Sequence, residues 1–359
     1  MTRSSLPLLD RWAWRWVPLL LGGWLSGCAQ VSYYLHLAEG QMQLMHRREP
    51  VTAILADSSR DARLRQRLAL AQRARAFATT QLHLPDNRSY LDYVQLDRPY
   101  VVWNVFATEA FSVEPRLHCM PLVGCVAYRG YYQQGRARGA AALLQLQGLD
   151  TQIAGIEAYS TLGWFADPLL SSMLHWDDPH LVGLIFHELA HQQFYLPGDT
   201  AFNESFASFV EREGLRQWRA RLGWTPPDPA LQRQREAFVA LMLHTRERLR
   251  ELYAQPWPDE HMRQRKQAEF DRLRREYRVL RDTRWNGDGR FDAWINGPLN
   301  NASLLPFGLY DQWLPAFAAL FQQVGENWPV FYARVRELGK LPAPERRQAL
   351  EELQTFGKP

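Results

Sequence analysis

The chain has 359 residues, of which 46% are hydrophobic and 13% aromatic, and this composition excludes an intrinsically disordered protein. Its formal net charge is only +4, and the three arginines and one aspartate of the first 28 residues account for half of it. The remainder, at about +2, lacks the strongly basic balance of nucleic-acid-binding proteins, so we expect no nucleic-acid partner.

The first 28 residues have the features of a secretory signal. An apolar run from Trp16 to Leu25 follows a basic start and is shorter than the roughly 20 residues that a membrane-spanning helix needs. LSGC, from Leu25 to Cys28, resembles the bacterial lipobox, which implies cleavage of a signal peptide, residues 1–27, and lipidation of Cys28. By resemblance to sorting in Gram-negative bacteria, Ala29 implies an anchor in the outer membrane, facing the periplasm. The alternative is a buried cysteine in an uncleaved anchor.

Two helices and then a small sheet are expected after the lipid site. Apolar residues recur at helical spacing over residues 31–48 and 56–82, with a start signal at Asp57 to Ser59 and a stop at residues 83–87. β-branched and aromatic residues then predict strands, with a crossing helix at residues 136–148 between the last two. The expected strands are residues 98–113, 126–133 and 152–160.

Two cysteines, Cys119 and Cys125, flank a short stretch in which Pro121 and Gly124 can turn the chain. In an oxidising periplasm we expect them to form a disulfide. Two other interpretations stay open: a metal pair with His118, whose spacing does not match the usual zinc knuckle, and two reduced buried thiols.

The stretch LVGLIFHELAHQQF begins as a buried helix and then carries polar groups that must be satisfied internally, which a bound cation would do. His187 and His191 are four residues apart, so their side chains leave one helix face about one turn apart, as two ligands of a tetrahedral zinc require. Glu188 is rotated by roughly 100° from His187. It can therefore stand beside the open position and act as the general base toward water.

The third zinc ligand is expected on the next helix. The first helix ends at LPGD, where Gly198 permits a reversal and Asp199 or Thr200 can cap a second helix. Glu204 lies 13 residues past His191 on this return helix and can point back at the histidines. The sequence thus predicts Zn²⁺ held by these two histidines and Glu204.

The rest of the chain is expected to be helical. Residues 228–253 and 259–281 carry charges along one face and are separated by AQPWP, whose prolines cannot continue a helix. We expect a helical hairpin, residues 228–281, and then two helices at residues 305–324 and 327–338.

The expected fold is α+β and mostly α: a small sheet precedes a two-helix zinc-binding core, and a long charged helical hairpin follows it. We expect one peptidase-like domain over residues 28–359. The sequence does not indicate an oligomeric state.

HELAHQ and NESFASFVE resemble the gluzincins, zinc peptidases with HExxH on one helix and NE on the next, and in particular the aminopeptidase N branch. Five blocks between Phe106 and Phe317, among them CMPLVGCVAYRGYY and NNASLLPFGLYDQW, resemble a family of predicted bacterial zinc aminopeptidases that carry lipoprotein signals. The interval between His191 and Glu204 is shorter here than in aminopeptidase N, and the exopeptidase motif GAMEN is missing. Cleavage at the N-terminus and cleavage within a peptide both stay open.

Further site residues are less sharply indicated. Tyr310 is a candidate to stabilise the oxyanion that forms on the peptide carbonyl, with a core tyrosine as the alternative. Ser208 lies one turn after Glu204 and could orient a zinc-bound histidine. Asp177 or Asp178 would cap the metal helix.

The gluzincin resemblance also implies a substrate groove along Ala158 to Gly163, where a peptide would bind as an added strand. Strand alternation would place Glu157, Tyr159 and Thr161 on one face of it. Glu157 stands where the aminopeptidase N glutamate would be, and is a candidate to hold the ammonium of a substrate. Ordinary strand and turn roles would also explain these residues.

Two functions from different classes are therefore compared. The first is a lipid-anchored zinc peptidase, for which the resemblance favours cleavage of peptides at the N-terminus. The second is an envelope lipoprotein with a structural zinc that acts as a binding or assembly factor, with the helical hairpin as its docking arm. Glu188 favours the first, because a structural zinc site has no use for a base beside an open position.

Overall fold

The computed structural model describes residues 30–120, 124–226 and 228–356. By its internal contacts the chain divides into two units, Met1–Arg47 and Arg48–Pro359. The described part of the first unit is one helix over residues 30–46, close to the range predicted for it. The predicted signal peptide, residues 1–27, and Cys28 lie outside the described residues. No helix in the described ranges is long and apolar enough to cross a membrane.

The second unit is mostly helical with small sheets, which confirms the predicted α+β class. Its strands form two three-stranded sheets, ordered β1-β2-β8 and β6-β3-β7, and one two-stranded hairpin, β4-β5. The strands are β1 (Glu49–Pro50), β2 (Asp92–Val94), β3 (Val102–Thr108), β4 (His118–Met120), β5 (Gly124–Val126), β6 (Tyr128–Tyr131), β7 (Asp150–Ile156) and β8 (Leu169–Leu170).

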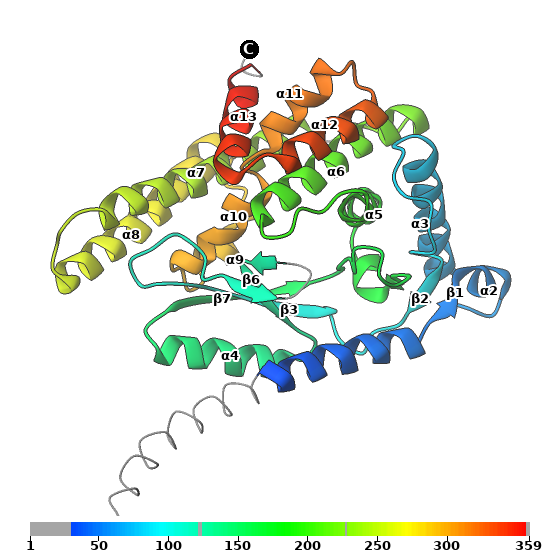
Figure 1. Ribbon diagram of the computed structural model, residues 1–359, viewed down its shortest axis with the longest axis horizontal. Helices are drawn as coiled ribbons and strands as arrows, with labels where there is room; N and C mark the ends of the chain where they lie inside the picture. Colours follow the sequence, from blue (N-terminus) through cyan, green and yellow to red (C-terminus); the bar gives the residue numbers. More distant parts are fainter. Residues whose placement is uncertain (1–29, 121–123, 227, 357–359) are drawn as a thin grey trace, which may run out of the picture. The chain divides into compact units, whose positions relative to one another are not determined.

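The β6-β3-β7 sheet is antiparallel, with the fully buried strand β3 in its centre. Helix α4 (Gln134–Leu146) contacts all three strands, and Figure 1 shows it along one face of the sheet. On the other side lie the short 3₁₀ helix η2 (Asn301–Leu304) and helix α10 (Leu305–Tyr310). The sheet therefore separates α4 from the helices that carry the candidate site.

Helices α5 (Asp178–Gln193) and α6 (Thr200–Leu222) pack against each other above this sheet (Figure 1). α5 also contacts α3, and α6 contacts α11. The ring centroid of Phe206 in α6 lies 5.8 Å from that of Phe317 and 6.1 Å from that of Phe331, so aromatic packing holds α6 to the C-terminal helices. These surrounding helices are α2 (Val51–Ala56), α3 (Ala62–Thr80), α11 (Leu314–Gln323), α12 (Trp328–Lys340) and α13 (Ala343–Phe356).

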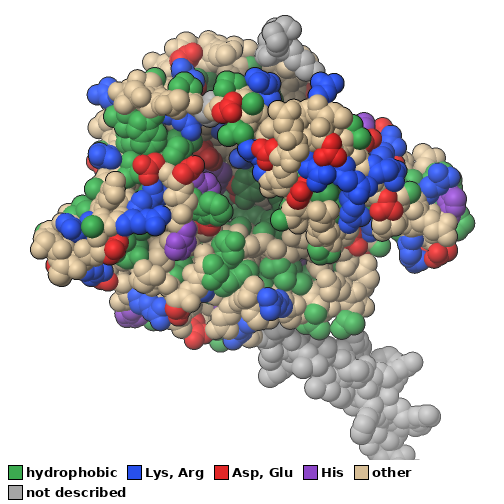
Figure 2. All heavy atoms as spheres, turned by 180° about the vertical axis from the view of Figure 1, so that it is seen from behind, with side chains coloured by type: hydrophobic (Ala, Val, Ile, Leu, Met, Phe, Trp, Pro, Cys, Tyr) green, Lys and Arg blue, Asp and Glu red, His purple; other side chains and the backbone are tan. Residues whose placement is uncertain are grey.

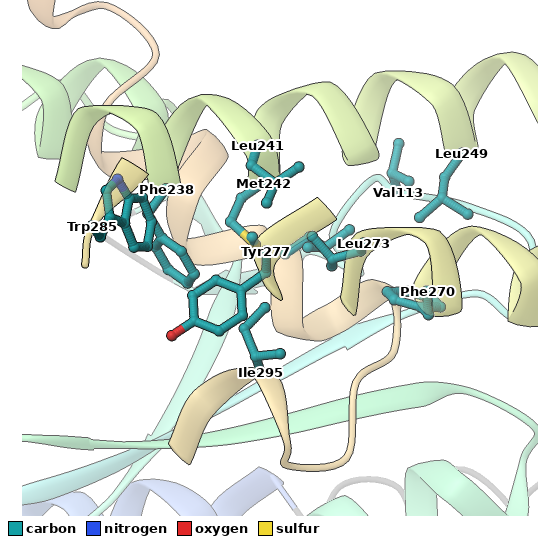
Figure 3. Close-up of a cluster of buried hydrophobic side chains, with 11 residues drawn as sticks. Val113, Phe238, Leu241, Met242, Leu249, Phe270, Leu273, Tyr277, Trp285 and Ile295 are labelled. Carbon is teal, nitrogen blue, oxygen red and sulfur yellow. The ribbon is translucent and has the colours of Figure 1, made fainter. Parts of the chain in front are cut away.

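The predicted helical hairpin consists of α7 (Pro229–Tyr253) and α8 (Asp259–Arg284). Its two helices enclose a buried cluster that includes Phe238, Met242 and Leu273, and residues outside the hairpin, among them Ile295, complete this cluster (Figure 3). Ile295 belongs to the single-turn helix α9 (Asp292–Ile295). The hairpin is therefore packed into the second unit rather than free along its whole length.

An ion pair and hydrogen bonds also hold the half of the hairpin that is nearer to its turn. Lys266 pairs with Asp150 at the start of β7 and donates a hydrogen bond to the carbonyl of Ala110, 2.9 Å away. The Tyr253 hydroxyl donates to Oδ1 of Asn301 over 2.8 Å. Polar groups of α7 and α8 thus meet the central sheet and η2.

Several predicted boundaries were wrong. The helix predicted at residues 305–324 is two helices, because the chain turns after Tyr310 and α11 starts at Leu314. Helix α3 begins after Asp61, whose carboxylate caps it, rather than at residues 57–59. The sheet β1-β2-β8 and helix α13 had not been predicted.

Candidate active site

Three side chains that could hold a metal ion meet between α5 and α6. His187 and His191 come from α5, and Glu204 comes from α6. Oε2 of Glu204 lies 3.4 Å from Nε2 of His187 and 3.6 Å from Nε2 of His191. Tetrahedral zinc with nitrogen and oxygen ligands needs neighbouring ligand atoms roughly 3.3–3.5 Å apart. The structure therefore brings the three predicted ligands together at suitable distances.

The turn between α5 and α6 is fixed by residues next to the ligands. Gly198 has a φ of 84°, which other residues rarely adopt, and it lets the chain reverse. Asp199 caps α6 by accepting a hydrogen bond from the backbone of its first turn at 3.0 Å. The Asn203 side chain both donates to and accepts from the backbone of Leu196, each at 2.8 Å. The asparagine of the NE pair thus holds the turn on which the position of Glu204 depends.

The start of α5 is capped as expected. The Asp177 carboxylate accepts a hydrogen bond from the backbone of His180 at 2.9 Å, and Pro179 occupies the first turn, where no backbone donor is needed. Asp178, which follows Asp177, forms an ion pair with Arg67 of α3. The metal helix is therefore fixed at both ends.

The metal-binding group is buried, and its charges are coupled. Burial alone lowers the pKa of His187, but hydrogen bonds with Glu204 and Glu211 outweigh this effect and raise that pKa to about 10. Burial raises the pKa of Glu204, but the two histidines outweigh it and lower that pKa to about 2. The negative charge of Glu204 that stabilises a proton on His187 would also stabilise a metal cation bound by the two histidines and Glu204. Zinc binds the ionised form of a carboxylate and the neutral form of an imidazole.

Glu211 was not predicted as a site residue, yet it contacts the first ligand. Its Oε2 lies 3.2 Å from Nδ1 of His187, on the ring edge opposite the Nε2 that faces Glu204. A carboxylate in this place fixes the orientation of a metal-binding imidazole. Ser208, the residue that the sequence offered as a candidate for this role, is buried on the same helix. Glu211 lies two helical turns after Glu204, and this spacing could have indicated it.

Glu188 is buried on α5 beside the two histidines. Burial raises its pKa, the histidines lower it, and the nearby carboxylates of Glu204 and Asp167 raise it again. The net shift is upward, which makes this carboxylate a better proton acceptor than a solvated one.

Tyr310 ends helix α10 next to the metal-binding group. Its ring centroid lies 6.3 Å from that of His187. Burial raises the pKa of Tyr310 well above its usual value, and the charge of Glu204 adds to this, so its hydroxyl stays a donor. Ser205 holds the segment in place: its hydroxyl donates to the carbonyl before Tyr310 at 3.2 Å and accepts from the backbone of Trp313 at 3.1 Å.

The expected groove segment is not an extended strand. β7 ends at Ile156, so the alternation predicted over residues 152–160 stops before Glu157. Glu157 lies instead against the metal helix, where its Oε2 is 2.9 Å from Nε2 of His180. The hydrogen bond that this carboxylate accepts from the imidazole raises the pKa of His180.

The other two groove candidates take part in separate contacts. The hydroxyls of Tyr132 and Tyr159 lie 2.8 Å apart. Thr161 bonds with the buried carboxylate of Asp167 through both its hydroxyl, at 2.7 Å, and its backbone N–H, at 2.9 Å. The shared face predicted from strand alternation is therefore absent in this described segment, although Thr161 is linked to a carboxylate that influences Glu188.

A disulfide joins Cys119 to Cys125 across the β4-β5 hairpin, which lies against the turn between the metal helices. A Cβ atom added at Gly124 would come within 2.6 Å of the backbone nitrogen of Gly198. Two glycines therefore allow backbone to meet backbone at this point.

Figure 2 shows a hollow in one face of the molecule, with hydrophobic side chains inside it and histidine and acidic side chains near its edge. His187, Glu188 and Glu204 each keep a small exposed fraction, between 6% and 8%. The metal-binding group is thus enclosed without being sealed from solvent.

The chain was also compared with known proteins. Residues 32–350 match the protein family described as "Putative aminopeptidase". The chain belongs to this family. The matched range includes α5, α6, the helical hairpin and Tyr310. All candidate site residues that the structure describes therefore lie within it. No curated protein and no solved structure matches the chain.

Proposed function

We propose that this protein is a zinc-dependent peptidase, and that it acts as an aminopeptidase. One observation carries the proposal: a buried group of two histidines and a glutamate, at distances that suit zinc, stands beside the buried carboxylate of Glu188. Membership of the aminopeptidase family supports the same reaction class.

The residues have distinct roles in this proposal. His187, His191 and Glu204 would hold the zinc, which when bound polarises the scissile carbonyl and makes a water molecule more acidic. Glu188 accepts the proton of the attacking water and passes it to the leaving amine. Tyr310 donates a hydrogen bond to the carbonyl oxygen as negative charge develops there.

The test uses soluble protein with Cys28→Ser, analysed for metal content and for hydrolysis of aminoacyl reporter substrates. We expect one zinc per chain and activity that is lost on chelation and restored by zinc. His187→Ala should lose most of the metal, whereas Glu188→Gln should keep it and lose turnover by at least about 100-fold. Full metal occupancy in His187→Ala, or unchanged turnover in Glu188→Gln, would contradict the proposal.

Aminopeptidase action requires a carboxylate that binds the free ammonium of the substrate, since a buried cation without a partner is strongly disfavoured. We retain Glu157 for this role. Its contact with Nε2 of His180 supports this role, although a substrate would have to compete with that histidine. Glu157→Gln should raise KM for substrates with a free amine and leave zinc content unchanged. Equal cleavage of N-acetylated and free peptides would identify an endopeptidase instead.

We also propose that the protein is anchored by a lipid on Cys28 to the outer membrane of the bacterial envelope and faces the periplasm. LSGC and the apolar run before it support this location. Peptides in that compartment would be its substrates.

A further inference from the structure

Tyr90 has two unfavourable features in the same residue. Its φ is 65°, in the left-handed region that bulky residues rarely occupy. Its side chain is 1% exposed, and its hydroxyl has no hydrogen-bond partner within the described residues. Strained or unpaired groups of this kind persist only where the surrounding structure enforces them, and they are concentrated at functional sites.

The surrounding structure does enforce this conformation. The backbone N–H of Tyr90 donates to the carbonyl of Asp167 at 2.6 Å, and its carbonyl accepts from the side chain of Gln72 at 2.7 Å. Arg75, also on α3, donates to the carbonyl of the preceding residue, Ser89, at 3.0 Å. Contacts from α3 and from the segment before β8 therefore fix Tyr90 on both sides.

The same network lies along the face of α5 that carries Glu188. Gln192 is one helical turn after Glu188, so the two side chains share a face. Nε2 of Gln192 donates to Ser89 Oγ at 3.3 Å and to Asp167 Oδ2 at 3.2 Å. The segment that ends in Tyr90 is thus held against the helix face of the proposed base. The charges of Glu188 and Asp167 add to the effect of burial, which raises the pKa of Tyr90 and keeps its hydroxyl a donor.

We infer that Tyr90 is a positioning residue for Glu188, to whose carboxylate its buried hydroxyl supplies a hydrogen bond in the metal-loaded, working site. This inference rests on the proposed peptidase function. The Tyr90 hydroxyl is buried and unpaired in the structure, and Glu188 is among the charges that act on it. Hydrogen bonds at a catalytic site often tighten only in the complex with substrate. Tyr90 therefore limits Glu188 to orientations in which it can take a proton from water.

Tyr90→Phe tests this inference because it removes only the hydroxyl. We expect kcat to fall about 10-fold or more, with KM and zinc content unchanged. In metal-free protein the melting temperature should stay the same or rise, because the variant loses a buried donor that has no partner there. Tyr332→Phe is the matched control: Tyr332 is equally buried, but its hydroxyl donates to the Leu82 carbonyl at 2.8 Å. It should lower the melting temperature and leave kcat unchanged.

A second measurement does not depend on activity. In zinc-loaded protein, the effects of Tyr90→Phe, Glu188→Gln and the double variant on the melting temperature should not be additive, because residues that interact are energetically coupled. If the wild type is active and Tyr90→Phe has the same kcat, the inference is overturned. Strictly additive effects of the two substitutions on the melting temperature would also overturn it. A zinc-loaded wild type that hydrolyses no peptide would instead refute the proposed function, and the additivity measurement would still decide whether the two side chains interact.

Discussion

At the scale of single residues, the contact between Glu211 and His187 fixes the orientation of one proposed metal ligand. Glu211→Ala should leave the fold intact but weaken zinc binding roughly 10- to 100-fold, because the imidazole loses the partner that fixes it. Competition with a chelator of known affinity measures this. Glu213→Ala serves as control, since Glu213 bonds with Arg216 and Gln217 on the same helix. Equal zinc affinity of both variants would contradict the assigned role of Glu211.

Asp167 should give the stability of the protein an unusual pH dependence. Burial raises its pKa from 3.8 to about 6, although bonds from Thr161 oppose this. Between pH 3.8 and about pH 6, Asp167 keeps its proton in the folded protein and loses it in the unfolded chain. The contribution of Asp167 to the free energy of unfolding therefore falls as pH rises. The loss is complete above about pH 6 and is on the order of 3 kcal/mol.

Urea unfolding of wild type and Asp167→Asn between pH 4 and pH 7 measures this contribution. The variant should become more stable relative to wild type as pH rises through the window. Two parallel pH curves would mean that Asp167 is ionised in the folded protein over the whole range.

The group of residues that could hold a metal was predictable from the sequence because its members lie within one helix–turn–helix, where spacing alone brings them together. Tyr90 and Asp167 were not. They are common residue types in irregular segments, and only the tertiary structure brings them to the face of α5. Glu211 lies between these cases: its spacing from Glu204 was visible, but a second carboxylate on a helix face is usually a solvated one.

At the scale of elements, the contact of the β4-β5 hairpin with the turn of the metal helices gives a sharp test. Gly124→Ala places a Cβ 2.6 Å from a backbone nitrogen, at a residue with a φ of 75°. It should destabilise the protein by at least about 2 kcal/mol and weaken zinc binding, because the turn must move. Thermal unfolding and zinc titration measure both effects.

Gly139→Ala is the control for that variant. Gly139 lies in α4 with no atom near the position of an added Cβ, so alanine there should stabilise the protein by about 1 kcal/mol. Similar destabilisation by both substitutions would show that the contact with the metal turn is not the cause.

Long helices with a strong periodic pattern were predicted well, and short elements were not. α5, α6, α7 and α8 all have clear start or stop signals, such as the caps at Asp177 and Asp199. β1 and β8 are two-residue strands whose pairing through β2 depends on distant segments. The break after Tyr310 follows from the bonds that Ser205 makes to both sides of it, which no local pattern indicates.

At the scale of the whole molecule, the helical hairpin is part of the peptidase unit. Its apolar cluster includes residues from segments on both sides of it in the chain, among them Val113 and Trp285 (Figure 3). Figure 2 shows Lys and Arg side chains gathered over its exposed surface. A docking arm could be removed without loss of the fold, whereas removal of this hairpin would expose the cluster to water.

The proposed lipid anchor predicts where the whole protein resides. Wild type should sediment with the membrane fraction of cells, and Cys28→Ser should move to the soluble fraction, because one acylated cysteine is the only attachment proposed. A double variant, Cys119→Ser with Cys125→Ser, should stay with the membranes. Membrane association of Cys28→Ser would refute the anchor.

The three metal-binding side chains lie within 18 consecutive residues, His187 to Glu204, whereas Tyr90 precedes them by 97 residues and Tyr310 follows them by 106. A helix pair of this size closes a short loop and can form early while a chain folds, but distant groups meet only after most of the chain has assembled. In the proposed peptidase, the order of assembly would thus separate metal uptake from hydrolytic competence. A partly folded chain would hold its ion without cutting the polypeptides around it.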